Sequence, residues 1–309
     1  MVHLRLIVPS HKTAAIFEYL ASTPGVAHVV ELQATRTTPA GTLVLCDVAR
    51  EAANEVVEWL QRQDIHHDGA ITVESLEAVV SDAAERASAE APGHGADALI
   101  WEEIEGRARA ESIVTTSFLV LMGIAAVIAG IGILLDAPIL IVGAMVVGPE
   151  YGPLAALCVA AVRRRSRPAV DAGMTLAGGL LLATFAALVT TLAFRWSGLA
   201  PASYDVSERE LTAFISHPDG MAAVVAVLAG VVGMLSLTQA RSGALIGVLV
   251  SVTTIPAAAN IGVAAAYREW PEVRGAALQL GLNLAGLVAA GIATLAVQSR
   301  ATASRRPRP

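Results

Sequence analysis

Six apolar segments, each with about the 20 residues that a membrane-spanning helix needs, follow residue 112. They cover residues 113–135, 138–162, 169–195, 219–239, 242–266 and 275–298. A helix of that length crosses a hydrocarbon core about 30 Å thick. Lipid offers no partner for backbone polar groups, so long apolar runs cross a membrane as helices. We therefore predict six transmembrane helices.

Charge and hydropathy divide the chain into two parts. The 309 residues are 55% hydrophobic, with a mean hydropathy of +0.61, which is high for a soluble protein. Residues 1–112 contain 18 Asp/Glu and 8 Lys/Arg, whereas residues 113–309 contain 9 and 13. This asymmetry indicates an acidic soluble module followed by a membrane domain over 113–298 and a basic tail over 299–309.

Residues 1–77 alternate between strand and helix patterns. The runs "HLRLIV", "AHVVELQATRTT", "GTLVLCDVA" and "AITVESL" read as strands, and "SHKTAAIFEYLAS" and "REAANEVVEWLQRQ" read as helices. The predicted order, β-α-β-β-α-β, is that of an α+β ferredoxin-like fold. Residues 78–112 read as a linker and a helix around Trp101 and Ile104, either amphipathic at the membrane surface or an ordinary connection.

Prolines interrupt the second and fifth apolar segments near their centres. The first break is "GPEYGP" at residues 148–153 and the second is "TTIP" at 253–256, so Pro153 and Pro256 lie 103 residues apart. Halves of three spans enter the membrane from opposite faces, so we predict two inverted repeats, each with a broken middle helix. Paired breaks of this kind mark the midplane binding site of transporters. Two merely proline-kinked helices are the alternative.

Glu150 is the residue that most strongly indicates function. It is the only Asp, Glu, Lys, Arg or His deep inside the six segments. A carboxylate at the bilayer centre costs about 2.5–3.5 kcal/mol on insertion scales, so it indicates a functional site by default. The alternative is a neutral glutamic acid that joins helices. The candidate substrate or ion site comprises Gly148, Pro149, Glu150, Tyr151, Gly152, Pro153, Thr253, Thr254, Pro256, Asn260, Gln279 and Asn283.

The stretches "VGAMVVGPEYGPL" and "GVLVSVTTIPAAANIGVA" resemble the family called domain of unknown function 389. The first stretch is similar to the family's Gly-Ala-Met followed by small-Pro-x-x-Gly-Pro pattern, here residues 143–145 and 148–153. The resemblance covers about residues 113–298. It implies an integral membrane protein of unsettled activity, and it supplies no catalytic residues.

Arginines predict the orientation. With the N-terminus in the cytoplasm, eleven arginines flank the spans on the cytoplasmic side and four on the external side. The positive-inside rule therefore predicts a multi-pass protein of the cell (inner) membrane with both termini cytoplasmic. The runs "RRRSRP" and "SRRPRP" read as topology signals, so we expect no nucleic acid partner. We expect contacts with membrane lipid and, because Gly243 and Gly247 permit close helix packing, a homo-oligomer.

Two classes of function fit these patterns. The first is a secondary transporter or channel for a small solute or ion, with a midplane site between the broken helices and an optional proton coupling through Glu150. The second is a membrane-anchored sensor or regulatory protein that acts through its ferredoxin-like domain. The spans contain no nucleophile or metal-protease motif and the chain has no phosphate-binding loop, so we expect neither enzyme activity nor a cofactor nor a metal.

Overall fold

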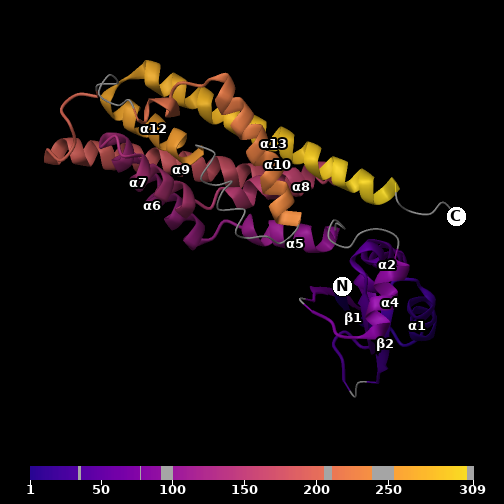
Figure 1. Cartoon of the computed structure of the whole chain (residues 1–309). Coiled ribbons are helices and arrows are strands. Elements are labelled where there is room, and N and C mark those ends of the chain that lie inside the picture. Colours follow the sequence, from indigo (N-terminus) through magenta and orange to yellow (C-terminus); the bar gives the residue numbers. More distant parts are fainter. Residues whose placement is uncertain (34–35, 77, 92–99, 205–210, 239–253, 305–309) are drawn as a thin grey trace. The chain divides into compact units, whose positions relative to one another are not determined.

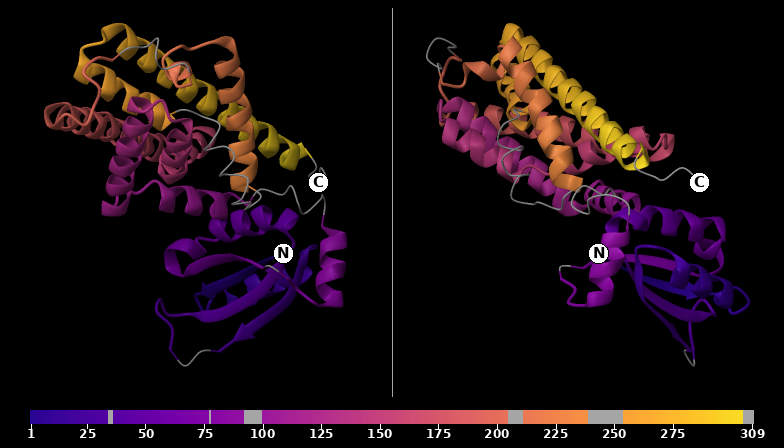
Figure 2. Two further views of the ribbon diagram at one scale, coloured as in Figure 1. Left: turned by 60° about the vertical axis from the view of Figure 1, so that its left-hand side comes forward. Right: turned by 45° about the vertical axis from the view of Figure 1, so that its right-hand side comes forward.

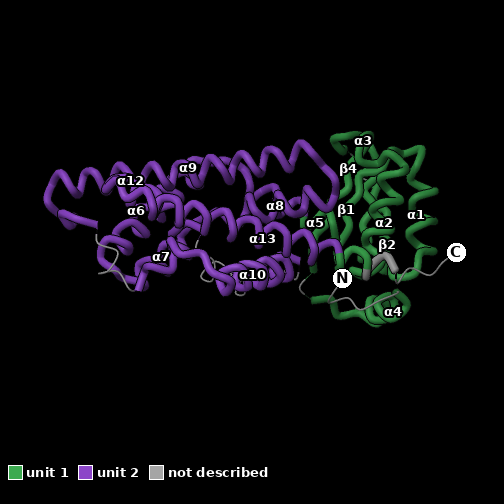
Figure 3. The backbone as a smooth tube through the Cα atoms, turned by 90° about the horizontal axis from the view of Figure 1, so that it is seen from above, with its two compact units in different colours: residues 1–104, 297–309 green, residues 105–296 purple. Residues whose placement is uncertain are grey.

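The computed structural model describes residues 1–33, 36–76, 78–91, 100–204, 211–238 and 254–304 (Figure 1). The chain divides into two compact units, coloured separately in Figure 3. The N-terminal unit contains Met1–Ile104 and Val297–Pro309, and the helical unit contains Glu105–Ala296. The segment 242–252 of the fifth predicted span, together with Gly243, Gly247 and Thr253, lies outside the described residues.

The N-terminal unit contains a four-stranded antiparallel sheet in the order β2-β3-β1-β4. Its elements are β1 (Val2–Val8), α1 (Thr13–Ser22), β2 (Val26–Leu32), β3 (Thr42–Val48), α2 (Arg50–Arg62), α3 (Ile65–Asp68) and β4 (Ala70–Ser75). The strands and the two long helices follow the order predicted from the sequence, with the four-residue α3 added before the last strand. Helix α4 (Asp82–Glu90) contacts β2.

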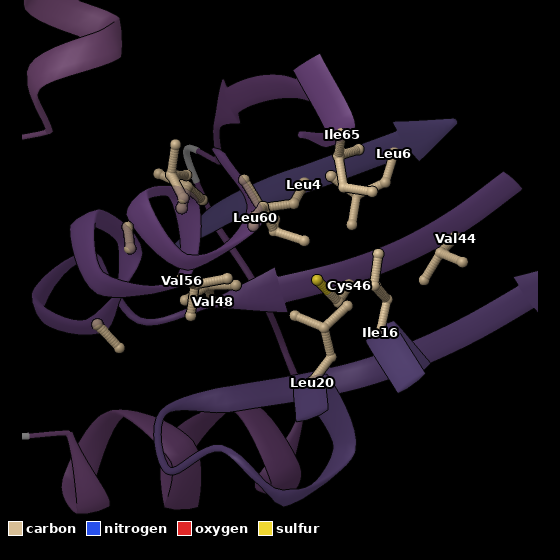
Figure 4. Close-up of a cluster of buried hydrophobic side chains, with 14 of the residues drawn as sticks. Leu4, Leu6, Ile16, Leu20, Val44, Cys46, Val48, Val56, Leu60 and Ile65 are labelled. Atoms are coloured by element: carbon tan, nitrogen blue, oxygen red, sulfur yellow. The ribbon is translucent and has the colours of Figure 1, made fainter. Parts of the chain in front are cut away.

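Period-two alternation builds the core of this unit. Val2, Leu4, Leu6 and Val8 of β1 are fully buried, whereas the residues between them are at least partly exposed. Figure 4 shows Leu4 and Leu6 among side chains from α1, α2 and β3. Burying a side chain of this size stabilises a fold by about 1.5–3 kcal/mol, so one face of the sheet carries most of the stability.

The helical unit consists almost entirely of apolar helices. These are α6 (Thr116–Leu134), α7 (Pro138–Val147), α8 (Tyr151–Val162), α9 (Ser166–Ser197), the short 3-10 helix η3 (Ala213–Ile215), α10 (Gly220–Thr238), α12 (Thr254–Tyr267) and α13 (Trp270–Ser304). Helix α5 (Trp101–Glu111) precedes them. Among the described residues, α6, α9, α10 and α13 are each long and apolar enough to cross a membrane, and the bent pair α7–α8 would make a fifth span. Of the six predicted spans, four or five are thus present.

Helix α9 separates large from small side chains as a membrane helix does. Its exposed face carries Val170, Met174, Leu181, Phe185, Val189 and Leu192, whose spacing follows the helical period. Its buried face carries mainly small residues, including Gly179, Ala183 and Ala187. Without a hydrophobic drive between helices in lipid, small residues permit the close backbone contact that holds spans together.

Helix boundaries in this unit recur after 104 residues. Helices α6 and α10 begin at Thr116 and Gly220, and α9 and α13 begin at Ser166 and Trp270, so both differences are 104. The same distance separates the caps before α6 and α10. There the Thr115 side chain accepts a hydrogen bond from the Phe118 N–H, and the Asp219 side chain accepts one from the Ala222 N–H.

Backbone features just after α8 and α12 repeat at the same distance. Arg164 and Arg268, which are 104 residues apart, both adopt left-handed backbone angles, with φ of 55° and 65°. Such angles are uncommon for residues other than glycine. Each arginine N–H bonds the carbonyl three residues earlier, at 3.1 Å in both cases. The two halves of the unit therefore share their local chain geometry.

Interhelical contacts recur in the same way. Helix α12 packs against α6 and α9, and Gly262 of α12 lies so close to the Thr184 backbone of α9 that no side chain would fit. Helix α8 packs against α10, and a Cβ on Gly291 of α13 would lie 3.0 Å from Cys158 of α8. Cys158 and Gly262 are 104 residues apart. Figure 2 shows α10 and α13 side by side, where Gly230 contacts Leu287.

Candidate functional site

The candidate site begins where the second span breaks. Helix α7 ends at Val147 and α8 begins at Tyr151, with a bend of 54° between the two helices. Pro149 falls inside the break, where its missing N–H rules out continuation of the helical ladder. Pro153 is the third residue of α8, where the first turn has no intrahelical partner for an N–H and proline is tolerated.

Glu150 lies at the N-terminal end of α8 and is 4% exposed. The hydroxyl of Thr254, the first residue of α12, donates a hydrogen bond of 2.7 Å to its Oε1 atom. Its Oε2 atom is buried and has no hydrogen-bond partner among the described residues. The carboxyl group thus joins the break between α7 and α8 to the start of α12.

Gly148 makes this approach possible. The position that a Cβ on Gly148 would take is already occupied by Cδ1 of Ile255 and crowded by Oε2 of Glu150. Ile255 is completely buried. A side chain at residue 148 would therefore push α12 away from the break, so the glycine is required by close packing.

Pro256 is the third residue of α12, the position that Pro153 holds in α8. Residues 239–253, which lead into the second predicted break at 253–256, lie outside the described residues. Both prolines therefore lie in first turns. Both residues are buried, and Thr253 lies outside the described residues.

Tyr151 and Gly152 hold the break against its neighbours. The Tyr151 hydroxyl donates a hydrogen bond of 2.5 Å to the Gly233 carbonyl of α10, which directs this side chain toward that helix. Gly152 lies against the backbone of Glu111 at the end of α5, with no space for a Cβ. These two predicted site residues are thus held by contacts with α10 and α5.

The predicted amides divide into two groups. Asn260 of α12 is 2% exposed, and its Oδ1 atom accepts a hydrogen bond of 2.8 Å from the Tyr204 hydroxyl. Gln279 and Asn283 of α13 are also 2% exposed and bond each other at 3.1 Å. The Oε1 atom of Gln279 is a second buried oxygen with no partner among the residues that the structure describes.

Sequence reasoning missed Tyr204 and the residues of α5. Tyr204 belongs to the connection between α9 and α10, where a single tyrosine gives no periodic signal. Its ring lies 5.5 Å from that of Tyr267, whose hydroxyl donates to the Pro201 carbonyl. The bonds from Tyr204 to Asn260 and from Tyr267 to Pro201 place the start of this connection against α12, through residue pairs more than 50 positions apart.

Comparison with known proteins finds a match to one family model. The family model described as domain of unknown function (DUF389) matches residues 145–289. No curated protein and no solved structure matches the chain. The matched segment contains the break, Thr254 and both predicted amide groups. The match to the domain of unknown function 389 family, over 145 (289 − 144) of the 309 residues, is the one that the sequence motifs predicted.

Proposed function

We propose that the chain is a secondary transporter or channel with its solute or ion site at Glu150 and Thr254. One observation carries the proposal: a buried carboxyl group bonds Thr254 through one oxygen, and its other oxygen has no partner among the described residues. A buried polar atom left unpaired costs about 1–3 kcal/mol. A proton, a cation or the donor group of a solute would satisfy that atom, which supports a binding role over a purely structural one.

We infer in addition that six spans form two inverted repeats. The proposal adds the predicted span 242–266, which begins outside the described residues, to the helices of the structure. Helix starts, caps and packing contacts separated by 104 residues support it. Glu150 and Thr254 are themselves 104 residues apart and touch. An internal two-fold axis brings equivalent residues together where it crosses the chain, so the axis of the proposed repeat passes through this contact.

Proton coupling follows from the same contact. A charged carboxylate at membrane depth is unfavourable unless water, a cation or donor groups surround it. When the site is closed, the neutral acid fits the apolar surroundings. When the site opens to water, the proton can leave and the charge can be solvated. Alternation between these states would couple proton movement to that of the solute.

We propose the remaining assignments on the sequence patterns. Both termini face the cytoplasm of a cell (inner) membrane, as the arginine distribution predicts. Subunits associate as a homo-oligomer, in contact with membrane lipid. The transport chemistry uses no cofactor or metal and makes no covalent bond, so the chain is not an enzyme.

Flux in proteoliposomes tests the function. The full chain is reconstituted in vesicles containing a pH-sensitive dye, and the uptake of monovalent ions and small organic acids is followed under imposed pH gradients. Glu150→Gln preserves shape and removes titration, so this variant should fold but lose the pH dependence of uptake. Thr254→Val is the matched control, because it removes the donor and leaves the carboxyl group. Identical pH dependence in Glu150→Gln and the parent would contradict the proposal.

A further inference from the structure

Helix α5 is shared between the two units. The boundary falls between Ile104 and Glu105, in the middle of this single helix, Trp101–Glu111. Its first half is built into the N-terminal unit. There Ile100, directly before the helix, belongs to the buried core, the Trp101 N–H donates to Asn54 at 3.2 Å, and Glu103 pairs with Arg50 at 3.2 Å.

The second half of α5 is built into the helical unit. Glu105 forms ion pairs with Arg163 at 2.8 Å and with Arg165 at 2.6 Å, directly after α8 ends. Arg107 donates to the carbonyl of Leu237 near the end of α10. Both carboxylate oxygens of Glu105 are therefore engaged, and α5 is anchored to two helices.

The end of α5 reaches the candidate site. The backbone and Cβ of Glu111 lie where a side chain on Gly152 would be, two residues after Glu150. From Glu105 to Glu111 the helix thus passes from the far end of α8 to its beginning. It covers the side of α8 that leads from the loop at Arg163 to the break.

A second segment holds the matching place in the other half of the unit. Residues 107 and 211 are 104 apart, and the Leu211 N–H and the Thr212 hydroxyl bond the Asp136 carboxylate just after α6 ends. Ser216 contacts Gly275 of α13, and η3 contacts α12. Leu211–Ser216 is therefore anchored just after α6, the first helix of one half. Helix α5 is anchored near the end of α10, the first helix of the other half.

We propose that the Glu105–Glu111 part of α5 closes one approach to the Glu150–Thr254 site. This inference rests on the proposed transport function. Leu211–Ser216, anchored by Asp136, closes the opposite approach. Loss of the Glu105 ion pairs opens the site on the α5 side only.

Chemical accessibility of the site tests this inference without requiring a known solute. A Thr254→Cys reporter is introduced into the full chain, and its modification by a membrane-impermeant maleimide is measured by mass spectrometry at that residue. Vesicles of both orientations expose either the α5 side or the opposite side. Glu105→Gln, which loses two partly exposed ion pairs, should raise the rate about tenfold from the α5 side only.

Matched variants distinguish a specific opening of the site from a general loss of packing in the helical unit. Asp136→Asn should raise the rate from the opposite side only. Reversing all three charges, Glu105→Arg with Arg163→Glu and Arg165→Glu, should restore the low rate.

The outcomes distinguish the two proposals. Equal labelling from both sides in Glu105→Gln, or an unchanged rate, overturns the role of α5. Labelling that is specific to the α5 side supports the closure by α5. If the flux of both the parent and Glu150→Gln is then independent of pH, proton-coupled transport is overturned while the closure is still supported.

Discussion

At the scale of single residues, two glycines of the family motif differ in what surrounds them. Gly148 has Ile255 and Glu150 where a Cβ would be, whereas Gly143 has no heavy atom within 4 Å of that position. Overpacking a well-filled site costs about 1–3 kcal/mol. Gly148→Ala should therefore lower the unfolding free energy in detergent by about that amount.

Gly143→Ala is the matched control for this substitution. An alanine inside a helix is favoured over glycine by roughly 0.5–1 kcal/mol, so this variant should be as stable as the parent or slightly more stable. Thermal unfolding of both variants in one detergent makes the comparison. Equal midpoints would show that α12 does not pack against the break as closely as Gly148 indicates.

Asp47 gives the N-terminal unit a predicted response to acid. Partial burial raises the pKa of Asp47, but hydrogen bonds with His28 and His3, both at 2.7 Å, lower that pKa by more, and the result lies below its usual value. A group whose folded pKa is depressed stabilises the fold above its unfolded pKa, about 3.9, and loses this contribution as the pH falls through the folded value.

Asp47→Asn should therefore destabilise the unit at neutral pH and flatten its loss of stability between about pH 5 and pH 2. Hydrogen exchange of the β3 amides, measured against pH in the full chain, reports on this unit alone. Asp68→Asn is the control, since Asp68 is 59% exposed and lies 3.5 Å from its partner Lys12. The prediction is wrong if both variants change the acid profile equally.

At the scale of elements, the sequence predicts those helices and strands whose residues follow a regular local pattern. Alternation in β1 and the apolar length of α6, α9 and α10 place these elements within a few residues of their observed ends. Contacts between distant segments leave no such pattern. The ion pairs of Glu105 and the bond between Tyr204 and Asn260 join residues more than 50 positions apart, so one sequence cannot reveal them.

The packing of α12 against α9 provides a further prediction. The Thr184 hydroxyl of α9 donates a hydrogen bond of 3.0 Å to the Ala258 carbonyl of α12, whereas Thr294 of α13 bonds Ala290 in its own helix. Interhelical bonds in membranes average about 0.6 kcal/mol. Thr184→Val should lower stability by about that amount. Thr294→Val should have a smaller effect in the same unfolding assay, and the reverse order would contradict this packing.

At the scale of the whole molecule, the predicted orientation in the membrane rests on the distribution of arginines. Some of these arginines form contacts within the protein. Arg195, predicted to be external, donates to the Ala266 carbonyl and lies 4.4 Å above the ring of Tyr267. Arg163 and Arg165, predicted to be cytoplasmic, pair with Glu105. Arg107, also predicted to be cytoplasmic, donates to the Leu237 carbonyl. Without these four residues the predicted bias is still eight arginines (11 − 3) against three (4 − 1).

This bias predicts that Ser203 lies outside the cell and Ser304 inside, since an odd number of spans separates them in the proposed six-span arrangement. Ser203→Cys should react with an impermeant maleimide in intact cells. Ser304→Cys should react only after permeabilisation. The parent chain controls for Cys46 and Cys158, which are both buried. Labelling of Ser304→Cys alone in intact cells would invert the orientation, and labelling of both variants would contradict an odd number of spans between them.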